Sequence, residues 1–137
     1  MTSLSFPDVN VCLAVLHADH PHREAARRWL NFDLTQRIGI SRIVQISLLR
    51  LLTTTSVMNN RPLSMEGAWR AHDKLFEDDL ISLFPEPGAI EELFRQHSSR
   101  SSASPKLWAD SYLLAFAEHA QGTLVTFDRA LAARSNA

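Results

Sequence analysis

Long hydrophobic runs and cysteines are scarce in this sequence of 137 residues. No apolar segment approaches the roughly 18 residues that a membrane-spanning helix needs, so we expect no association with a membrane. The N-terminus has no basic leader, and Asp8 interrupts its apolar stretch, which argues against a secretory signal. Cys12 is the only cysteine, which excludes an intrachain disulfide and favours a reducing, cytoplasmic setting.

An excess of positive charge is also absent. The chain has 14 Lys and Arg residues against 15 Asp and Glu residues, a net charge of −1, which excludes a general electrostatic attraction to nucleic acid. Any binding of RNA must therefore depend on local basic patches or on bound cations. Lysine itself occurs only at positions 74 and 106, and the remaining basic residues are arginines, which suit bidentate contacts with phosphate.

The residues that are present predict one globular domain over 1–137. Hydrophobic residues make up 45% of the chain and charged residues 21%, which is enough to form a core. The hydrophobic patterns predict strands at 4–6, 38–41, 80–84 and 123–126, and helices at 9–16, 21–30, 43–52, 63–76, 89–96 and 105–120. Gly122 stands where glycine commonly ends a helix. Short strands alternating with helices favour a parallel sheet covered on both faces, in which ligands bind beyond the carboxyl ends of the strands.

Three aspartates are expected near that edge of the sheet. Asp8 follows the first predicted strand, and Asp128 follows the last. Asp110 shares the inward stripe of its helix with apolar residues three, four and seven positions later. A lone carboxylate in that stripe costs several kcal/mol unless it is neutralised, paired or bound to metal. One shared acidic cleft would account for all three positions.

Simpler roles are open for each aspartate taken alone. Asp8 and Asp128 can cap the helices that follow them, because aspartate is a favoured N-cap residue. Asp110 can form a structural bridge with Arg50 or another buried arginine. If the three do share a cleft, their carboxylate oxygens suit Mg²⁺ or Mn²⁺.

Zinc is a poor fit to this sequence. The histidines at 17, 20 and 22 form a cluster, but no cysteine or acidic partner completes a tetrahedral set. We expect them to be solvated residues near a helix end and give them no role.

Three segments together resemble the motifs of PIN-domain ribonucleases, specifically VapC-type toxins of bacterial toxin–antitoxin pairs. They are residues 6–11 (Phe-Pro-Asp-Val-Asn-Val), 107–115 (Leu-Trp-Ala-Asp-Ser-Tyr-Leu-Leu-Ala) and 124–131 (Leu-Val-Thr-Phe-Asp-Arg-Ala-Leu). Residues 43–53 also resemble the second motif of the family. The order and spacing of these segments match the family across nearly the whole chain.

The resemblance implies a three-layer α/β/α PIN-like domain with a central parallel sheet of four to five short strands. It implies an endoribonuclease dependent on Mg²⁺ or Mn²⁺ that cleaves RNA phosphodiester bonds with a metal-activated water. Asp8, Asp110 and Asp128 are then the expected catalytic and metal-binding residues, the first two as direct ligands. Asn10 and Thr126 match the polar positions that support them. The implied partners are a VapB-type antitoxin and a second copy of the toxin in a homodimer.

One position departs from the family pattern. The second motif usually supplies a glutamate, whereas the best-matching residue here is Gln45, which helical spacing turns inward. Its amide oxygen is an additional candidate metal ligand without charge, or the side chain is a hydrogen-bonded core amide. Gln45 therefore keeps an alternative function open: a catalytically weak or inactive PIN-like module that binds RNA or protein. Arg129, beside Asp128, is a candidate for contact with phosphate.

Two other classes of α/β protein fit the sequence less well. A response-regulator receiver domain needs adjacent acidic residues after its first strand and a lysine late in the chain, whereas this chain has only Asp8 and no lysine after Lys106. A haloacid-type phosphatase needs a second aspartate where Asn10 stands.

Overall fold

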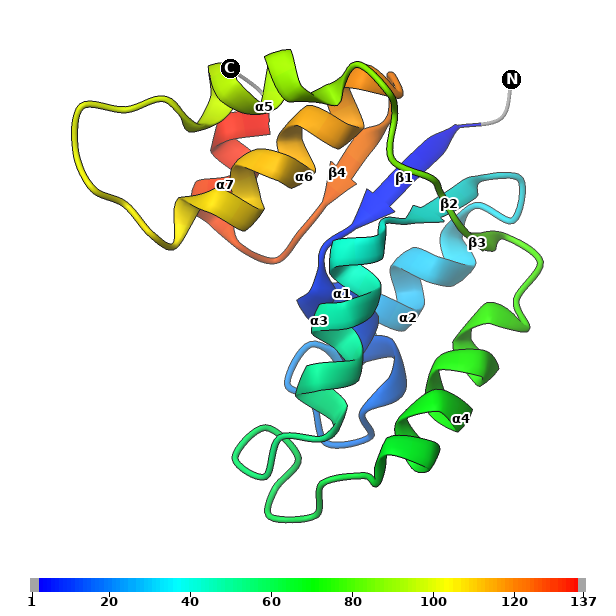
Figure 1. The fold of residues 1–137 in the computed structure, drawn as a ribbon. Helices are drawn as coiled ribbons and strands as arrows, with labels where there is room; N and C mark the ends of the chain where they lie inside the picture. The colour runs from blue at the N-terminus through cyan, green and yellow to red at the C-terminus, as the bar shows by residue number, and fades with distance from the viewer. Residues whose placement is uncertain (1–2, 136–137) are drawn as a thin grey trace.

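A four-stranded parallel sheet forms the centre of the computed structural model, which describes residues 3–135 (Figure 1). The strands are β1 (Leu4–Pro7), β2 (Arg37–Ile40), β3 (Ile81–Leu83) and β4 (Thr123–Val125). Their order is β3-β2-β1-β4, and every neighbouring pair is parallel. The expected α/β fold is confirmed, at the lower end of the predicted number of strands. Because β1 and β4 are parallel neighbours, their carboxyl ends lie side by side.

Helices cover both faces of this sheet. They are α1 (Val9–Leu16), α2 (Arg23–Phe32), α3 (Arg42–Leu52), α4 (Met65–Phe76), α5 (Ile90–Ser98), α6 (Leu107–His119) and α7 (Arg129–Ser135). Figure 1 shows α5, α6 and α7 grouped on one side of the sheet and α1, α2, α3 and α4 on the other. None of the helices within residues 3–135 has the length and apolar character needed to cross a membrane.

Helix α7 is the one element for which the sequence patterns predicted no range. Only Leu131 of its seven residues is buried, so the segment carries no apolar stripe long enough to show helical periodicity. Asp128 nevertheless begins this helix as an N-cap residue, which is one of the two roles expected for it.

The end of α6 differs from the expectation for Gly122. Gln121, not Gly122, has the left-handed conformation, with a φ of 57°. The N–H of Gly122 donates to the carbonyl oxygen of Ala117 at 2.9 Å, and the N–H of Gln121 donates to that of Glu118 at 3.1 Å. These two bonds form a Schellman motif with Gln121 at its left-handed position.

Gly122 is instead required by the close approach of Phe6. A Cβ atom at Gly122 would lie 2.6 Å from Phe6 Cε2 and 2.9 Å from the carbonyl oxygen of Leu4. Gly39, on the neighbouring strand β2, faces the other side of the same ring, and a Cβ atom there would overlap Phe6. Phe6 is buried and packs edge-on against Phe116 of α6, with ring centroids 5.3 Å apart. Two glycines thus make the space for one aromatic ring between the sheet and α6.

Gly39→Ala should therefore destabilise the protein. The added methyl group forces Phe6 to move in a well-packed core, which typically costs about 1–3 kcal/mol. The measurement is the free energy of unfolding in urea. Gly88→Ala is the matched control, because a Cβ atom at Gly88 meets nothing within 4 Å. Equal stability of the two variants would show that Phe6 does not need the space at Gly39.

Candidate active site

Asp8 lies between the end of β1 and the start of α1, and it is buried. One carboxylate oxygen accepts from the backbone N–H of Val11 at 3.1 Å, so Asp8 is the N-cap residue of α1. The other oxygen accepts a short hydrogen bond from the hydroxyl of Thr126. The backbone N–H of Asp8 also donates to the carbonyl oxygen of Val125 in β4, at 2.9 Å. Asp8 therefore caps α1 and also belongs to a polar site with Thr126.

Asp128 caps α7 in the same manner at the end of β4. Its Oδ1 accepts from the backbone N–H groups of Ala130 at 2.9 Å and Leu131 at 3.2 Å. The N–H of Asp128 itself donates to the hydroxyl oxygen of Thr126 at 3.0 Å. One threonine hydroxyl therefore connects the residues that follow the two adjacent strands.

Asp110 reaches this edge from the first turn of α6, where it is partly buried. Burial raises the pKa of Asp110 above its usual value, and the negative charges of Asp128 and then Asp8 raise it further. The Arg134 guanidinium opposes these effects and lowers the pKa. The alternative of a structural bridge to Arg50 is not observed, since no direct ion pair joins the two side chains.

The electrostatics of Asp8 show the same crowding of negative charge. Burial is the largest effect and raises the pKa of its carboxyl group, while the hydrogen bonds from Thr126 and Val11 lower it. The charge of Asp128 raises the pKa of Asp8 again. The charge of Asp128 thus acts on both Asp8 and Asp110, and that of Asp8 acts on Asp110, at one edge of the sheet.

The carboxylate oxygens of the three aspartates are the type of ligand that a hard divalent cation prefers. Within residues 3–135, no three His, Cys, Asp or Glu side chains are arranged around a single point as ligands. Mg²⁺ does not require such a set, because it is often bound by one or two carboxylates with water and substrate phosphate in the remaining positions. Asp8 and Asp110 are the two carboxylates whose pKa values are raised by burial and by neighbouring negative charge, and a cation would relieve both effects.

Gln45 is buried in α3 and is hydrogen-bonded at both ends of its amide. Its Oε1 accepts from the Arg42 guanidinium at 2.6 Å, and its Nε2 lies 3.1 Å from Nε2 of His72 in α4. Nδ1 of His72 lies 2.9 Å from the Asp73 carboxylate, which assigns the proton to Nδ1 and leaves Nε2 to accept from Gln45. Of the two expectations for Gln45, these contacts match the hydrogen-bonded core amide, and its oxygen faces Arg42 rather than an aspartate.

The remaining expected residues lie around the aspartates. Asn10 is exposed in the first turn of α1, and its backbone N–H interacts with the Asp8 carboxylate. Thr126 is the hydroxyl group that joins Asp8 to the backbone of Asp128, as described above. Arg129 is exposed at the first position of α7.

Sequence reasoning missed Arg134, which approaches Asp110 from α7. Its Nη2 donates to the carbonyl oxygen of His97 and to the hydroxyl of Ser111, both at 3.0 Å. Its Nη1 is buried and has no hydrogen-bond partner among the described residues. No pattern in the sequence pointed to Arg134, because its helix is short and its partners lie on α5 and α6.

Comparison with known proteins identifies the family of this chain. The model of the PIN domain family matches residues 5–136. The chain belongs to the PIN-domain family. Ribonuclease VapC41 of Mycobacterium tuberculosis is 39% identical over 128 residues, which cover 90% of this chain and 88% of that protein. Ribonuclease VapC44 of the same organism is 29% identical over 130 residues, covering 91% and 86% of the two chains.

A solved PIN-domain structure agrees with the fold. The crystal structure of Mycobacterium tuberculosis VapC20, described as a Sarcin-Ricin loop cleaving toxin, matches with a TM-score of 0.66. The match covers 95% of this chain and 94% of VapC20 at 15% identity, so it supports the fold alone. The resemblance to PIN-domain ribonucleases of the VapC type is confirmed by the family match and by the similarity to VapC41.

Asp110→Asn should stabilise the metal-free protein at neutral pH. The folded-state pKa of Asp110 lies above its usual value of 3.8, so ionisation of this carboxyl group weakens the folded state. Relative to the variant, the wild type therefore loses stability as the pH rises through the raised pKa, and the difference closes below the unfolded-state pKa. After screening by solvent we expect up to about 1 kcal/mol, measured by thermal unfolding from acidic to neutral pH.

The control for this prediction is Asp79→Asn, which changes an exposed aspartate in the turn before β3. Its unfolding temperature should follow that of the wild type at every pH. A destabilised Asp110→Asn variant at neutral pH would mean that the ionised carboxylate supports the fold, contrary to the crowding of charge described here.

Proposed function

We propose that the protein is a Mg²⁺- or Mn²⁺-dependent endoribonuclease and the toxin component of a type II toxin–antitoxin pair in the cytoplasm. The observation that carries this proposal is the arrangement at the carboxyl ends of β1 and β4, where Thr126 connects Asp8 to Asp128 and the charges of Asp8 and Asp128 both act on Asp110. Ligands bind at this edge of parallel sheets. The names of the ribonuclease relatives support RNA as the substrate.

Each of these side chains would have a separate role in the hydrolysis of a phosphodiester bond. Asp8 and Asp110 would hold the divalent cation, which supplies charge at the scissile phosphate and lowers the pKa of an attacking water. Thr126 and the N–H of Val11 fix both oxygens of Asp8, so this ligand is oriented before substrate arrives. Asp128 would orient the attacking water, and its cap at α7 holds it in place.

Basic side chains complete the proposed site. Arg129 is exposed immediately after Asp128 and would contact a phosphate of the RNA backbone. Arg134, fixed to Ser111 and to the carbonyl of His97, limits the repulsion that Asp110 experiences without forming a direct ion pair with it.

The proposed partners follow from the family. A VapB-type antitoxin would bind the toxin and block cleavage, and the toxin would form a homodimer. The VapC ribonucleases among its relatives support the antitoxin partner, whereas the homodimer rests on the family resemblance alone. Co-expression of the chain with the antitoxin gene beside its own, followed by co-purification and sizing, measures both.

Asp8→Asn and Asp110→Asn should each reduce RNA cleavage by about 100-fold or more, because each removes a ligand that carries charge. The measurement is cleavage of total cellular RNA by purified protein with Mg²⁺ or Mn²⁺, before and after addition of EDTA. The RNA should stay largely intact with either variant, and with the wild type after addition of EDTA.

Asp79→Asn is the control for this experiment, since it alters the net charge equally at an exposed site. It should cleave at the wild-type rate. Full cleavage by Asp8→Asn and Asp110→Asn, or cleavage that persists in EDTA, would reject the assignment of these residues.

Gln45 favours a second candidate function, a PIN-like module that binds RNA or protein without efficient cleavage. Its amide brings no negative charge, and its oxygen already accepts from Arg42. The two functions differ in their response to Mn²⁺. A nuclease should gain thermal stability with increasing Mn²⁺, by about 2.7 kcal/mol at 100 times the dissociation constant, and Asp8→Asn should abolish the gain. A module without cleavage should show no such shift.

A further inference from the structure

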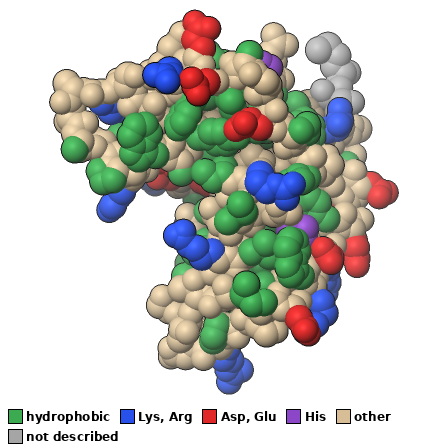
Figure 2. Space-filling view, viewed as in Figure 1, with side chains coloured by type: hydrophobic (Ala, Val, Ile, Leu, Met, Phe, Trp, Pro, Cys, Tyr) green, Lys and Arg blue, Asp and Glu red, His purple; other side chains and the backbone are tan. Residues whose placement is uncertain are grey.

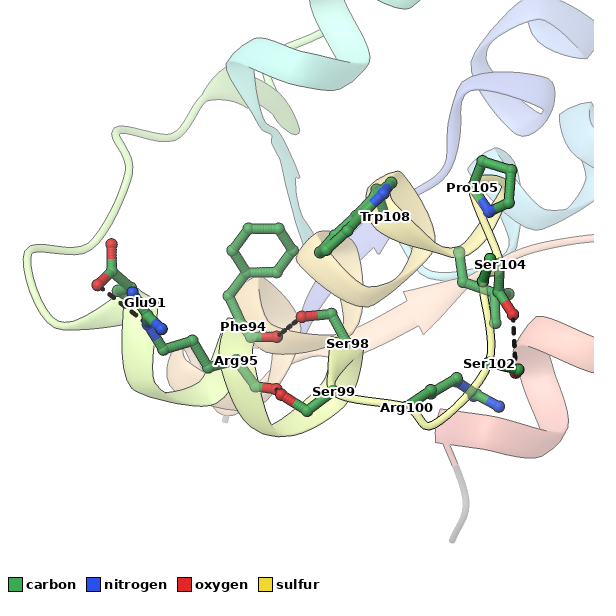
Figure 3. A pocket seen from close by; sticks show the side chains of 12 residues that line it. Glu91, Phe94, Arg95, Ser98, Ser99, Arg100, Ser102, Ser104, Pro105 and Trp108 are labelled. Atoms are coloured by element: carbon green, nitrogen blue, oxygen red, sulfur yellow. Dashed lines mark hydrogen bonds and ion pairs between the residues drawn. The ribbon is translucent and has the colours of Figure 1, made fainter.

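A large hollow lies between α5 and α6, apart from the aspartates (Figure 3). It has a volume of about 760 Å³, within the range of small-ligand sites. Helix α5 forms one side, the first turn of α6 forms another, and the serine-rich segment 99–106 runs around its margin. Neither the proposed hydrolysis nor the core packing accounts for it.

An exposed tryptophan forms the upper wall of this hollow. Trp108 is 60% exposed, although large aromatic side chains usually lie inside proteins. Its ring meets that of Phe94 edge-on, with centroids 6.3 Å apart, and Phe94 in turn meets Tyr112 edge-on at 5.6 Å. Figure 3 shows the Trp108 and Phe94 rings side by side above the hollow. The indole is therefore supported by other aromatic rings while much of its surface remains free for stacking.

The charge around the hollow is positive in a chain whose net charge is −1. Arg95 and Arg100 line it, and Lys106 is exposed next to it. The only acidic lining residue, Glu91, accepts from Arg95 at 3.2 Å, so its charge is matched. Arg100 lies on the exposed segment after α5, where its guanidinium is available to an anion.

Helix α6 carries residues of both the hollow and the acidic edge. Trp108 and Asp110 both lie in the first turn of this helix, and Trp108 precedes Asp110 by about 3 Å along the helix axis. Leu107, which also lines the hollow, is one helical turn before Asp110 and Ser111. Residues two positions apart project from nearly opposite sides of a helix, so an RNA strand bound at Asp110 would pass around the start of α6 to reach Trp108.

We propose that this hollow binds an unpaired base of the RNA outside the acidic edge, with Trp108 stacking on the base and Arg100 contacting an adjoining phosphate. The proposal rests on the proposed ribonuclease function and adds to it a subsite for single-stranded RNA. Aromatic rings combined with basic side chains are the usual means by which proteins hold single strands. The subsite would position the strand and would take no part in the bond cleavage itself.

A second hollow, between α3 and α4, makes the assignment more specific. It is lined mainly by apolar side chains, including Ile46, Met65 and Trp69, and Arg50 is its only charged residue. Figure 2 shows hydrophobic side chains gathered over both pairs of helices. The surface of α3 and α4 has the character of a protein contact, whereas the combination of aromatic rings with Arg100 and Lys106 beside α5 and α6 favours RNA.

The test is the affinity of the full-length protein for a short, unstructured, fluorescently labelled oligoribonucleotide, measured by anisotropy in EDTA so that cleavage is suppressed. Trp108→Ala should weaken binding by about 10-fold or more, and Trp108→Phe should recover much of the loss, because stacking on a base tolerates either ring. Trp69→Ala is the matched control, since Trp69 is 47% exposed on the other hollow, and its affinity should equal that of the wild type.

Arg100→Ala should reduce the slope of log affinity against log salt by about 0.7, the value for one phosphate contact on a single strand. Arg28→Ala, which removes an exposed arginine on α2, should leave the slope unchanged. On a cleavable oligoribonucleotide with Mg²⁺, Trp108→Ala should raise KM while kcat stays within about threefold, as expected for loss of uniform binding.

Unchanged affinity and KM in Trp108→Ala, with thermal unfolding like that of the wild type, would overturn the subsite even if the chain cleaves RNA. Dissociation of a homodimer by Trp108→Ala without loss of RNA affinity would identify the hollow as a protein contact and would also overturn it. Absence of cleavage by the wild type under all metal conditions would reject the nuclease function, and the binding experiment in EDTA would still decide the subsite.

Discussion

The hydroxyl group of Thr126 holds the acidic edge of this protein together. It donates to the Asp8 carboxylate and accepts from the N–H of Asp128, so the ends of β1 and β4 are joined where two aspartates leave the sheet. A hydroxyl orients a carboxylate without cancelling its charge, whereas an arginine in the same place would neutralise it. Asp8 is therefore fixed in position by hydrogen bonds from neutral groups and not by a positive charge. The negative potential of the site depends on the fact that the Thr126 hydroxyl carries no charge.

Much of this arrangement follows from local features of the sequence. The ends of adjacent parallel strands share one edge, so the positions of Asp8 and Asp128 could be predicted from the strands that precede them. Asp110 was recognisable because it interrupts an apolar stripe. Arg134 was not, because its contacts with α5 and α6 arise only from tertiary packing and its helix is too short to show a period. The PIN-domain resemblance covers the motifs that carry the aspartates and gives no information on Arg134.

Gln45 illustrates where sequence reasoning stops. Helical spacing correctly turned it inward, and it is buried. The choice between a metal ligand and a core amide depended on its neighbour His72, which lies 27 residues further along the chain on another helix. Gln121 is a similar case, since its left-handed backbone was expected at the adjacent glycine. Gly122 was needed for space rather than for backbone freedom, and only the packed position of Phe6 reveals that need.

The ring of Phe6 also lies between the two elements that carry Asp8 and Asp110. It lies two residues before Asp8, and it packs against Phe116 on the helix that carries Asp110. Glycines flank the two edges of this ring, and its contact with α6 is the edge-on packing against Phe116. A hydrocarbon contact in the interior therefore helps to place the segment that carries Asp8 relative to the helix that carries Asp110. Selection on nuclease activity would then act on core residues that never meet the substrate.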